Sequence, residues 1–350
     1  MTFAVPADAG PPDATRIARL PKVELHVHLE GAIPVQRVVA LAAARGQPLK
    51  RPVNHLFRTQ TLDEFLANLD WMCSLVTAES DARQIALDFA AYARTQGIVY
   101  AEVIVNPTHW RGLDSASLLG AIADGFDAAH AADGVDLRLL PSLLRQQPLD
   151  EALRLVDCMA ALRHPRIAGL SIDGNQARAL DSSIRLAPAF ERARTLGFAT
   201  TAHAGESSGP EGVAAALDLL RVQRIDHGVR AAEDALLMQR LARERVTLNV
   251  CLASNCHLLY ADIDAHPLRQ LLAAGVPCTL NTDDPVVLGT TLNDELVWAT
   301  AALDWTFDQL VTVQRNAIAA AFCSATDKAR LTAILEANLT EHTDHDRTGD

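Results

Sequence analysis

The sequence has no long uninterrupted apolar stretch. Although 49% of its 350 residues are hydrophobic, Arg, Asp, Glu or Gln interrupts every apolar run before it reaches the roughly 20 residues of a membrane-spanning helix. The N-terminal segment, MTFAVPADAGPPDATRIARL, also lacks the basic start and apolar core of a secretory signal. We therefore expect a cytoplasmic protein with no membrane partner.

Positive charge, aromatic residues and paired cysteines are also scarce. The chain has 31 Lys and Arg against 43 Asp and Glu, and its net charge of −12 would repel a polyanion, so we expect no nucleic-acid partner. Aromatics make up 5%, which together with the mixed charges is typical of an ordinary globular protein. The six cysteines include no CxxC pair, and a chain this long needs no disulfides, so we interpret them as reduced thiols.

Composition changes only near the two ends of the chain. Residues 1–18 are rich in Pro, Ala and Gly, and we interpret them as a flexible arm. Residues 341–350, EHTDHDRTGD, form a polar tail. No linker or low-complexity block interrupts residues 19–340, which we interpret as a single domain of ample size for one core.

Short runs rich in Leu or β-branched residues recur along this domain, and each is followed by a longer amphipathic stretch. Eight of these runs are interpreted as strands: Val23–His28, Ile98–Val105, Leu137–Leu144, Ile167–Ile172, Phe198–His203, Arg224–Asp226, Thr247–Cys251 and Cys278–Asn281. Strands that alternate with helices form parallel βα units. Eight units predict a (β/α)8 TIM barrel, with a doubly wound sheet as the alternative.

Polar residues with catalytic potential fall where the predicted strands end, which is where (β/α)8 enzymes carry their chemistry. In ELHVHLEG (24–31), His26 and His28 are two residues apart on a strand, so both imidazoles face the same side. Two such imidazoles suit a borderline metal such as zinc. A hydrogen-bonded pair of core histidines is the alternative interpretation.

Two further histidines and a glutamate occupy similar positions. In TAHAGESSG (201–209), His203 can act as a third ligand, and Glu206 can act as a proton donor if burial raises its pKa. A surface loop is the alternative. In RIDHGVR (224–230), His227 is a ligand, a residue that orients the attacking water, or a structural histidine.

Adjacent carboxylates end the eighth predicted strand. In TLNTDDP (279–285), one of Asp283 and Asp284 can bind the metal while the other accepts a hydrogen bond from the attacking water. A helix N-cap before Pro285 is the alternative for Asp284. Taken together, these residues supply what metal-assisted hydrolysis needs: a Lewis acid, a water, a base and an acid.

With these motifs in order, the sequence resembles the adenosine/adenine deaminase family of the amidohydrolase superfamily. The motifs are PKVELHVHLEG (21–31), AHAGE (202–206), DHG (226–228), SN (254–255) and NTDDP (281–285). The resemblance implies one zinc ion per chain, held by His26, His28, His203 and Asp283. It also implies that Glu206 protonates a purine ring nitrogen, that His227 assists deprotonation of the attacking water and that Asp284 holds this water. Family members often place extra helices over the mouth of the site.

The substrate implied by the resemblance is an adenine-type aminopurine. We expect adenosine or a related nucleoside, with free adenine or a modified adenine as the alternative. Glu30 stands where adenosine deaminases usually carry an Asp that reaches the ribose, and Glu is more usual in adenine-type relatives. Gly174, within SIDGNQAR (171–178), matches the purine-contacting segment loosely. Glu30, Gly174 and Asp284 are therefore the predicted substrate contacts.

Two other classes of function remain as alternatives. Another mononuclear zinc amidohydrolase could act on an amide, lactone or phosphoester. The fourth predicted strand ends in Ile172-Asp173-Gly174, without the Lys that bridges two metals in many such enzymes, which favours a single metal. A non-catalytic binding protein is less favoured, because every expected catalytic residue is present.

Overall fold

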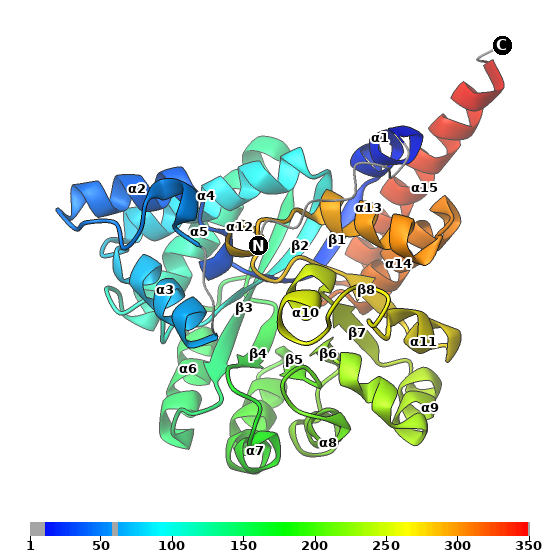
Figure 1. Cartoon of the computed structure of the whole chain (residues 1–350). Helices are drawn as coiled ribbons and strands as arrows, with labels where there is room; N and C mark the ends of the chain where they lie inside the picture. Colours follow the sequence, from blue (N-terminus) through cyan, green and yellow to red (C-terminus); the bar gives the residue numbers. More distant parts are fainter. Residues whose placement is uncertain (1–10, 58–61, 349–350) are drawn as a thin grey trace.

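Eight parallel strands form one barrel whose order in space is their order in the sequence (Figure 1). The computed structural model describes residues 11–57 and 62–348. The strands are β1 Lys22–His28, β2 Ile98–Val105, β3 Asp136–Leu144, β4 Gly169–Asp173, β5 Ala199–Ala204, β6 Arg224–His227, β7 Thr247–Val250 and β8 Cys278–Leu280. The predicted (β/α)8 barrel is therefore confirmed.

The observed strand bounds lie within two residues of the predicted ones. The largest difference is at β4, which begins at Gly169 and not at Ile167. At Gly169 the next strand comes very close, because an added Cβ would lie 2.6 Å from the carbonyl oxygen of Ala199. The ladder between β4 and β5 starts at this pair, whereas Ile167 forms only an isolated bridge with Leu139.

The barrel closes between its first strand and the residues that follow its last. Val27 and Asp283 form a parallel bridge, in which His28 N donates to Asp283 O over 2.7 Å and Asp283 N donates to His26 O over 3.2 Å. Two of the predicted metal ligands on β1 are thereby placed beside the acidic pair at 283–284. The seam of the barrel and the candidate site coincide.

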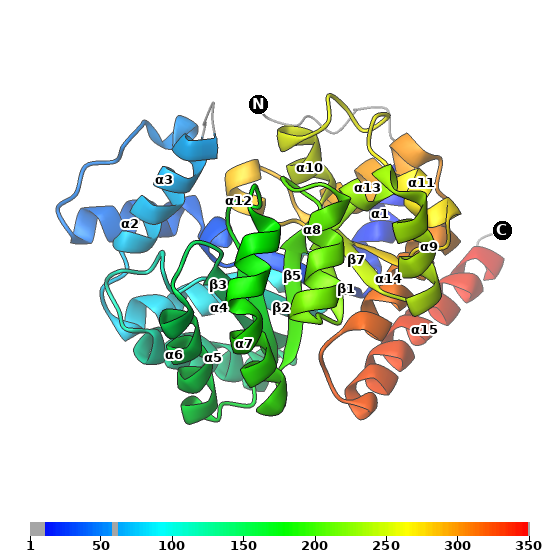
Figure 2. The same ribbon diagram turned by 90° about the horizontal axis from the view of Figure 1, so that it is seen from below.

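Helices surround the barrel, and further helices lie at the end where the strands finish. The helices are α1 Pro11–Arg19, α2 Val35–Ala44, α3 Leu62–Ser74, α4 Glu79–Thr95, α5 Ser115–Asp133, α6 Leu149–Leu162, α7 Ala179–Thr195, α8 Pro210–Ala215, α9 Ala235–Glu244, α10 Leu252–Leu258, α11 Leu268–Ala273, α12 Pro285–Leu288, α13 Leu292–Leu303, α14 Phe307–Ala320 and α15 Ala325–Thr348. Figure 2 shows α3, α10 and α12 at one end of the barrel. The 3-10 turn Glu30–Ala32 contacts both α12 and α3, as expected for helices over the mouth.

Helices lie near both ends of the chain. Residues 11–18 of the predicted flexible arm belong to α1, where Ile17 is buried and Arg16 lies over the ring of Phe307. One apolar side chain and one cation–π contact hold this helix against the barrel, and the flexibility of the arm stays a prediction. Residues 1–10 lie outside the described residues. Helix α15 continues to Thr348, so the predicted tail is helical up to that residue.

The opposite end of the barrel is closed by the link between α14 and α15. Arg224 and Glu102 form a fully buried ion pair with a 2.6 Å separation between Nη2 and Oε2, and Tyr100 donates to the same carboxylate. Phe322, from the link, stacks on the Arg224 guanidinium at 4.0 Å.

None of the described helices is long and apolar enough to cross a membrane.

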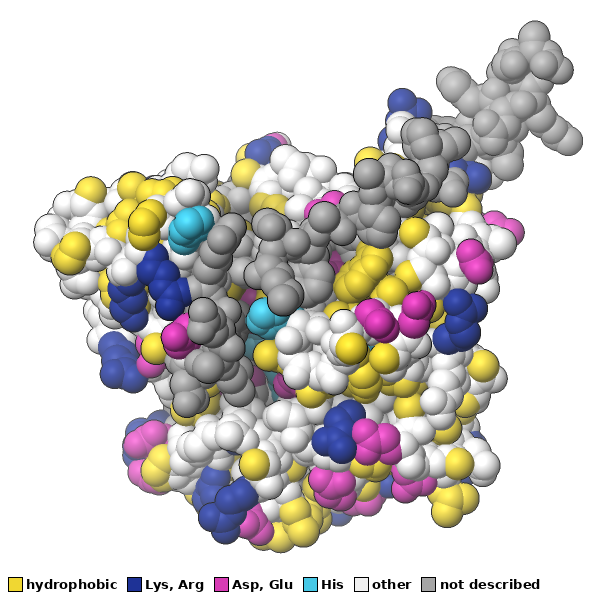
Figure 3. All heavy atoms as spheres, viewed as in Figure 1, with side chains coloured by type: hydrophobic (Ala, Val, Ile, Leu, Met, Phe, Trp, Pro, Cys, Tyr) yellow, Lys and Arg dark blue, Asp and Glu magenta, His cyan; other side chains and the backbone are white. Residues whose placement is uncertain are grey.

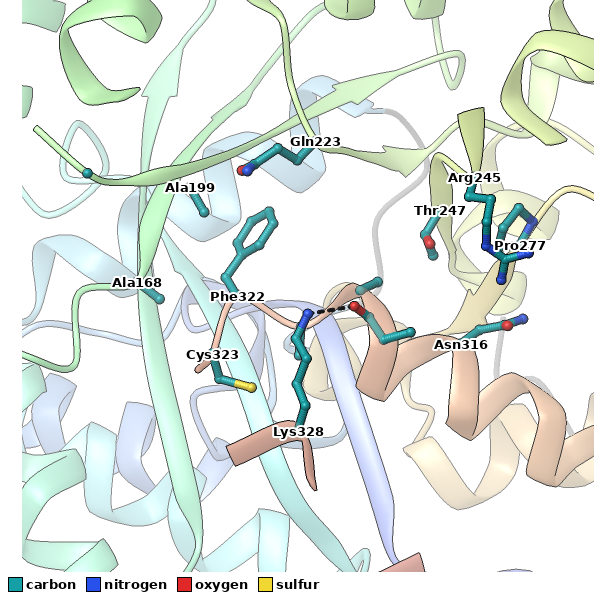
Figure 4. A pocket seen from close by; sticks show the side chains of 14 residues that line it. Ala168, Ala199, Gln223, Arg245, Thr247, Pro277, Asn316, Phe322, Cys323 and Lys328 are labelled. Atoms are coloured by element: carbon teal, nitrogen blue, oxygen red, sulfur yellow. Dashed lines mark hydrogen bonds between the residues drawn. The ribbon is translucent and has the colours of Figure 1, made fainter. Parts of the chain in front are cut away.

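A cleft of about 590 Å³ lies beside Phe322 and the link between α14 and α15 (Figure 4). It is lined by residues at the starts of strands, including Ala199 and Thr247, and by Phe322 and Lys328 from the opposite side. The Lys328 ammonium donates to the carbonyl oxygen of Ala319 over 2.7 Å. Because (β/α)8 enzymes act at the other end of the barrel, this cleft is not the candidate active site.

Candidate metal centre and active site

The four predicted metal ligands lie close together at the carboxyl ends of the strands. The ligand atoms of His26, His28, His203 and Asp283 all lie within 4.8 Å of one another. Asp283 Oδ1 lies 3.0 Å from His26 Nε2 and 3.4 Å from His28 Nε2, and His28 Nε2 lies 3.0 Å from His203 Nε2. The structure thus brings together residues from β1, β5 and the end of β8.

This cluster fits a tetrahedral zinc ion by donor type and by spacing. Zinc takes imidazole nitrogen and carboxylate oxygen at roughly 2.0–2.2 Å, so ligand atoms around one ion should lie roughly 3.4 Å apart. The three separations above are close to this value. His227, Cys251 and Asp283 form a second group with ligand atoms inside 4.8 Å, but it supplies only three donors.

A carboxylate not singled out from the sequence lies behind the cluster. Asp226 Oδ1 is 3.2 Å from His26 Nδ1, and its Oδ2 is 3.8 Å from His203 Nδ1. Asn249 Nδ2 donates to Asp226 Oδ1 over 2.8 Å. A carboxylate facing Nδ1 keeps a proton there and leaves Nε2 free for a metal. An acidic residue inside the predicted strand Arg224–Asp226 is the sequence signal that could have revealed it.

The backbone is strained at two residues of the site. His227 and Asp283 both have φ +64°, a region that side chains other than Gly rarely adopt. Such strain persists only where the surrounding structure fixes it, and it concentrates at functional sites.

Glu206 faces the cluster from the turn after β5. Its Oε1 lies 3.7 Å from His227 Nε2, and its Oε2 accepts a hydrogen bond from Gln176 Nε2 over 2.9 Å. Gln176 is buried, and its Oε1 in turn accepts a hydrogen bond from the hydroxyl of Ser208. Burial raises the pKa of the Glu206 carboxyl, as a proton donor requires. Gln176 was not identified from the sequence.

Asp284 does not use its side chain to cap the helix that follows it. It occupies the N-cap position of α12, yet its side chain makes no capping bond, and its buried Oδ1 finds no partner among the described residues. Burial, Asp283 and Glu30 together raise the pKa of Asp284 well above its usual value. Gly31 allows this close approach, because a Cβ there would lie 1.9 Å from Asp284 Oδ1.

Glu30 and Gly174, two of the predicted substrate contacts, have different surroundings. Glu30 is buried, and its Oε1 accepts bonds from the indole of Trp110 and the amide of Asn106, each over 2.7 Å. Burial raises the pKa of Glu30 to about 7. Gly174 follows β4 with φ +91°, where a Cβ would lie 2.8 Å from Leu144. Its contact with a substrate stays a prediction.

The cluster lies beneath an open face of the molecule. Figure 3, which has the same viewpoint as Figure 1, shows histidine side chains at and inside the hollow near the centre of this face, with acidic atoms beside them. The hollow is at the carboxyl ends of the strands. A (β/α)8 barrel with three His and one Asp at this end defines a metal-dependent hydrolase of the amidohydrolase type.

Comparisons with known proteins give the family. The model of the adenosine deaminase family matches residues 21–337, and the chain belongs to this family. It is 35% identical over 322 residues to an adenine deaminase of Sinorhizobium medicae, covering 91% of this chain and 99% of that protein. The family places this chain among the hydrolytic deaminases of aminopurines.

Solved structures agree with this placement. The crystal structure of an adenine deaminase from Arthrobacter aurescens superposes with a TM-score of 0.86 at 28% identity, covering 92% of this chain and 99% of that one. An amidohydrolase from Burkholderia ambifaria with bound Zn superposes with a TM-score of 0.89 at 30% identity, covering 96% and 95%. The similarity therefore extends over the whole barrel.

Proposed function

We propose that this chain deaminates free adenine by hydrolysis, with one zinc ion held by His26, His28, His203 and Asp283. The convergence of these four side chains on one point carries the proposal, since it joins residues up to 257 positions apart. A bound zinc ion would supply a Lewis acid that makes water nucleophilic at neutral pH. The names of the relatives favour the free base over the nucleoside that we expected from the sequence.

Glu206 is the proposed proton donor. Burial raises the pKa of its carboxyl group, which favours the protonated form that a donor needs, and Gln176 donates a hydrogen bond that orients this group. Transfer of that proton to a ring nitrogen of the purine makes the carbon that bears the amino group more electrophilic. Water then adds to this carbon and gives one proton to Asp284. The amino group takes up that proton and leaves as ammonia, while the remaining hydroxyl proton returns to Glu206 as the C=O bond forms.

Asp284 is the proposed acceptor for the proton of the attacking water. The two adjacent carboxylates have different surroundings. Asp283 lies among the histidines, whereas the Asp284 Oδ1 atom is buried and free of hydrogen bonds within residues 11–57 and 62–348. A buried carboxylate oxygen without a hydrogen bond, next to the clustered histidines, is placed to accept this proton.

Glu30 supports the choice of the free base. One of its oxygens is bound by Trp110 and Asn106, whereas the buried Oε2 makes no hydrogen bond to any part of the chain that the structure describes. A buried carboxylate oxygen calls for an N–H donor. Free adenine carries such an N–H on its five-membered ring, whereas in adenosine the ribose replaces that hydrogen.

Ammonia release from a panel of aminopurines tests this proposal. The zinc-loaded enzyme should be assayed with adenine, adenosine, deoxyadenosine and N6-substituted adenines under the same conditions. We expect kcat/KM for adenine to exceed that for adenosine by at least about 100-fold, equivalent to about 2.7 kcal/mol. A preference for any nucleoside would reject the substrate, and no turnover of any member would reject the deaminase assignment.

A further inference from the structure

His227 begins a series of three hydrogen bonds. The series runs through two further side chains and ends on a backbone amide. His227 Nδ1 lies 3.1 Å from Asn255 Nδ2, and Asn255 Oδ1 lies 3.3 Å from His266 Nε2. The amide N–H of Leu268 donates to His266 Nδ1 over 3.1 Å. All three side chains are buried. From the sequence, His266 has no assigned role, and Asn255 is only part of the SN motif.

The backbone amide at the far end sets the direction of the whole chain of bonds. An N–H group can only donate, so Nδ1 of His266 must accept and carries no proton. Burial lowers the pKa of His266 to about 4, which keeps the ring neutral near pH 7. The remaining ring proton is therefore on Nε2, and it points at the side-chain amide of Asn255.

The orientation of the Asn255 amide follows from this proton. Its oxygen must face the N–H of His266, because the reverse orientation would place an NH2 group against another N–H. The Asn255 NH2 group then faces His227 and donates to its Nδ1. In the neutral ring the proton of His227 is consequently on Nε2.

Nε2 is the atom of His227 that faces the reaction centre. It lies 3.7 Å from Glu206 Oε1 and 3.9 Å from Asp283 Oδ2. We propose that Asn255 and His266 are positioning residues that hold His227 as the Nε2–H tautomer. His227 then offers the attacking water a hydrogen-bond donor, in place of the deprotonating role that the family resemblance implies.

The proposed tautomer also suits the surroundings of His227. Asp283 Oδ2 lies 3.9 Å from Nε2, and a protonated Nε2 facing this carboxylate is favourable, whereas a lone pair there would be repelled. The assigned tautomer does not depend on the substrate. Only its effect on turnover rests on the proposed function.

Nitrogen NMR of the zinc-loaded enzyme with ¹⁵N-labelled histidine tests the tautomer directly. The two signals of His227 are assigned by their loss in His227→Gln. We expect Nε2 to be protonated and Nδ1 to be an unprotonated acceptor in the wild-type enzyme. A protonated Nδ1 in the wild type would overturn the proposal, whether or not the enzyme turns over adenine.

Asn255→Asp tests the kinetic consequence with almost no change in shape. A carboxylate oxygen replaces the NH2 group, still accepts from His266, and forces a proton onto His227 Nδ1. We expect that NMR change together with a fall in kcat on the order of 10²–10⁴-fold, as for other wrong-tautomer variants, at unchanged zinc content. Asn54→Asp, which adds the same charge at an exposed position, is the control.

Replacement of His266 separates hydrogen bonding from packing. His266→Leu removes the donor to Asn255, whereas His266→Gln keeps an N–H donor on its side chain. We expect His266→Leu to show both His227 tautomers and about a tenfold lower kcat than His266→Gln, with KM little changed. If Asn255→Asp matches Asn54→Asp in kcat, or if the two His266 variants are equal, the positioning role is rejected.

Discussion

The side-chain amide of Gln176 donates a hydrogen bond to Glu206 Oε2 across 2.9 Å, and so fixes the carboxyl group proposed as proton donor. Gln176→Leu should release this carboxyl group. We expect kcat to fall about 10- to 100-fold because a small misplacement of a reacting group is costly, with zinc content unchanged. Steady-state kinetics against the exposed control Arg178→Gln measures this effect. An unchanged kcat would mean that Glu206 is oriented by other contacts.

Glu206→Gln removes the transferable proton and keeps the size of the side chain. We expect zinc to remain bound, because Glu206 is not among the four clustered ligands, and turnover to fall about 10²–10⁴-fold. Metal content by elemental analysis and ammonia release by a coupled assay provide the two measurements. Full activity in this variant would contradict the role of acid.

Asp226→Asn should weaken zinc binding without removing a ligand. Asp226 faces Nδ1 of both His26 and His203, and loss of its charge lowers the basicity of these two rings. We expect zinc affinity, measured by competition with a chelator, to fall about 10- to 100-fold. Asp218→Asn, which changes an exposed ion pair with Arg240, is the control and should bind zinc like the wild type.

Gly31→Ala tests whether Asp284 needs its observed position. The new methyl group would lie 1.9 Å from Asp284 Oδ1, so the carboxylate must move away. We expect about a 100-fold loss of kcat with zinc retained. Gly120→Ala, where the new Cβ meets only Leu162 at 3.8 Å, is the matched control. Equal activity of the two variants would show that the position of Asp284 does not matter.

Glu295 should make folding stability depend on pH. Burial raises its pKa to about 8, although it accepts bonds from the amides of Leu252 and Ala253. The folded state therefore holds a proton that the unfolded state releases above about pH 4.5, so this side chain costs stability as pH rises from there to about 8.

Glu295→Gln has no such proton. Relative to the wild type, the variant should gain up to about 1.4 kcal/mol of unfolding free energy per pH unit within this window. Urea unfolding of both proteins at pH 6 and pH 8 gives the difference. If it is the same at both pH values, the ionisation of Glu295 does not change on unfolding.

The barrel was predictable because its strands repeat a simple pattern. Short apolar runs and amphipathic stretches alternate eight times, and the polar residues at strand ends follow from where such barrels carry chemistry. The exact strand ends were less predictable. At Gly169 the start of β4 depends on the neighbouring Ala199, which no local pattern in the sequence reveals.

The side chains that orient the candidate site were harder to find than those that form it. Gln176 and Glu206 are 30 residues apart and meet only because β4 and β5 are neighbours. Asn255 and His266 lie on segments without strand pattern, and their direction of hydrogen bonding depends on one backbone amide. Such contacts follow from packing between elements, whereas ligand histidines are marked by their residue type.

The seam of the barrel also fixes when the metal centre can form. Because Asp283 bridges Val27 and lies 257 positions after His26, the proposed fourth ligand is among the last parts of the barrel to be synthesised. A growing chain on the ribosome carries the histidines long before it has this carboxylate. The four-residue site is therefore complete only when the barrel is complete, and a bound ion would link the first strand to the residues that follow the last one.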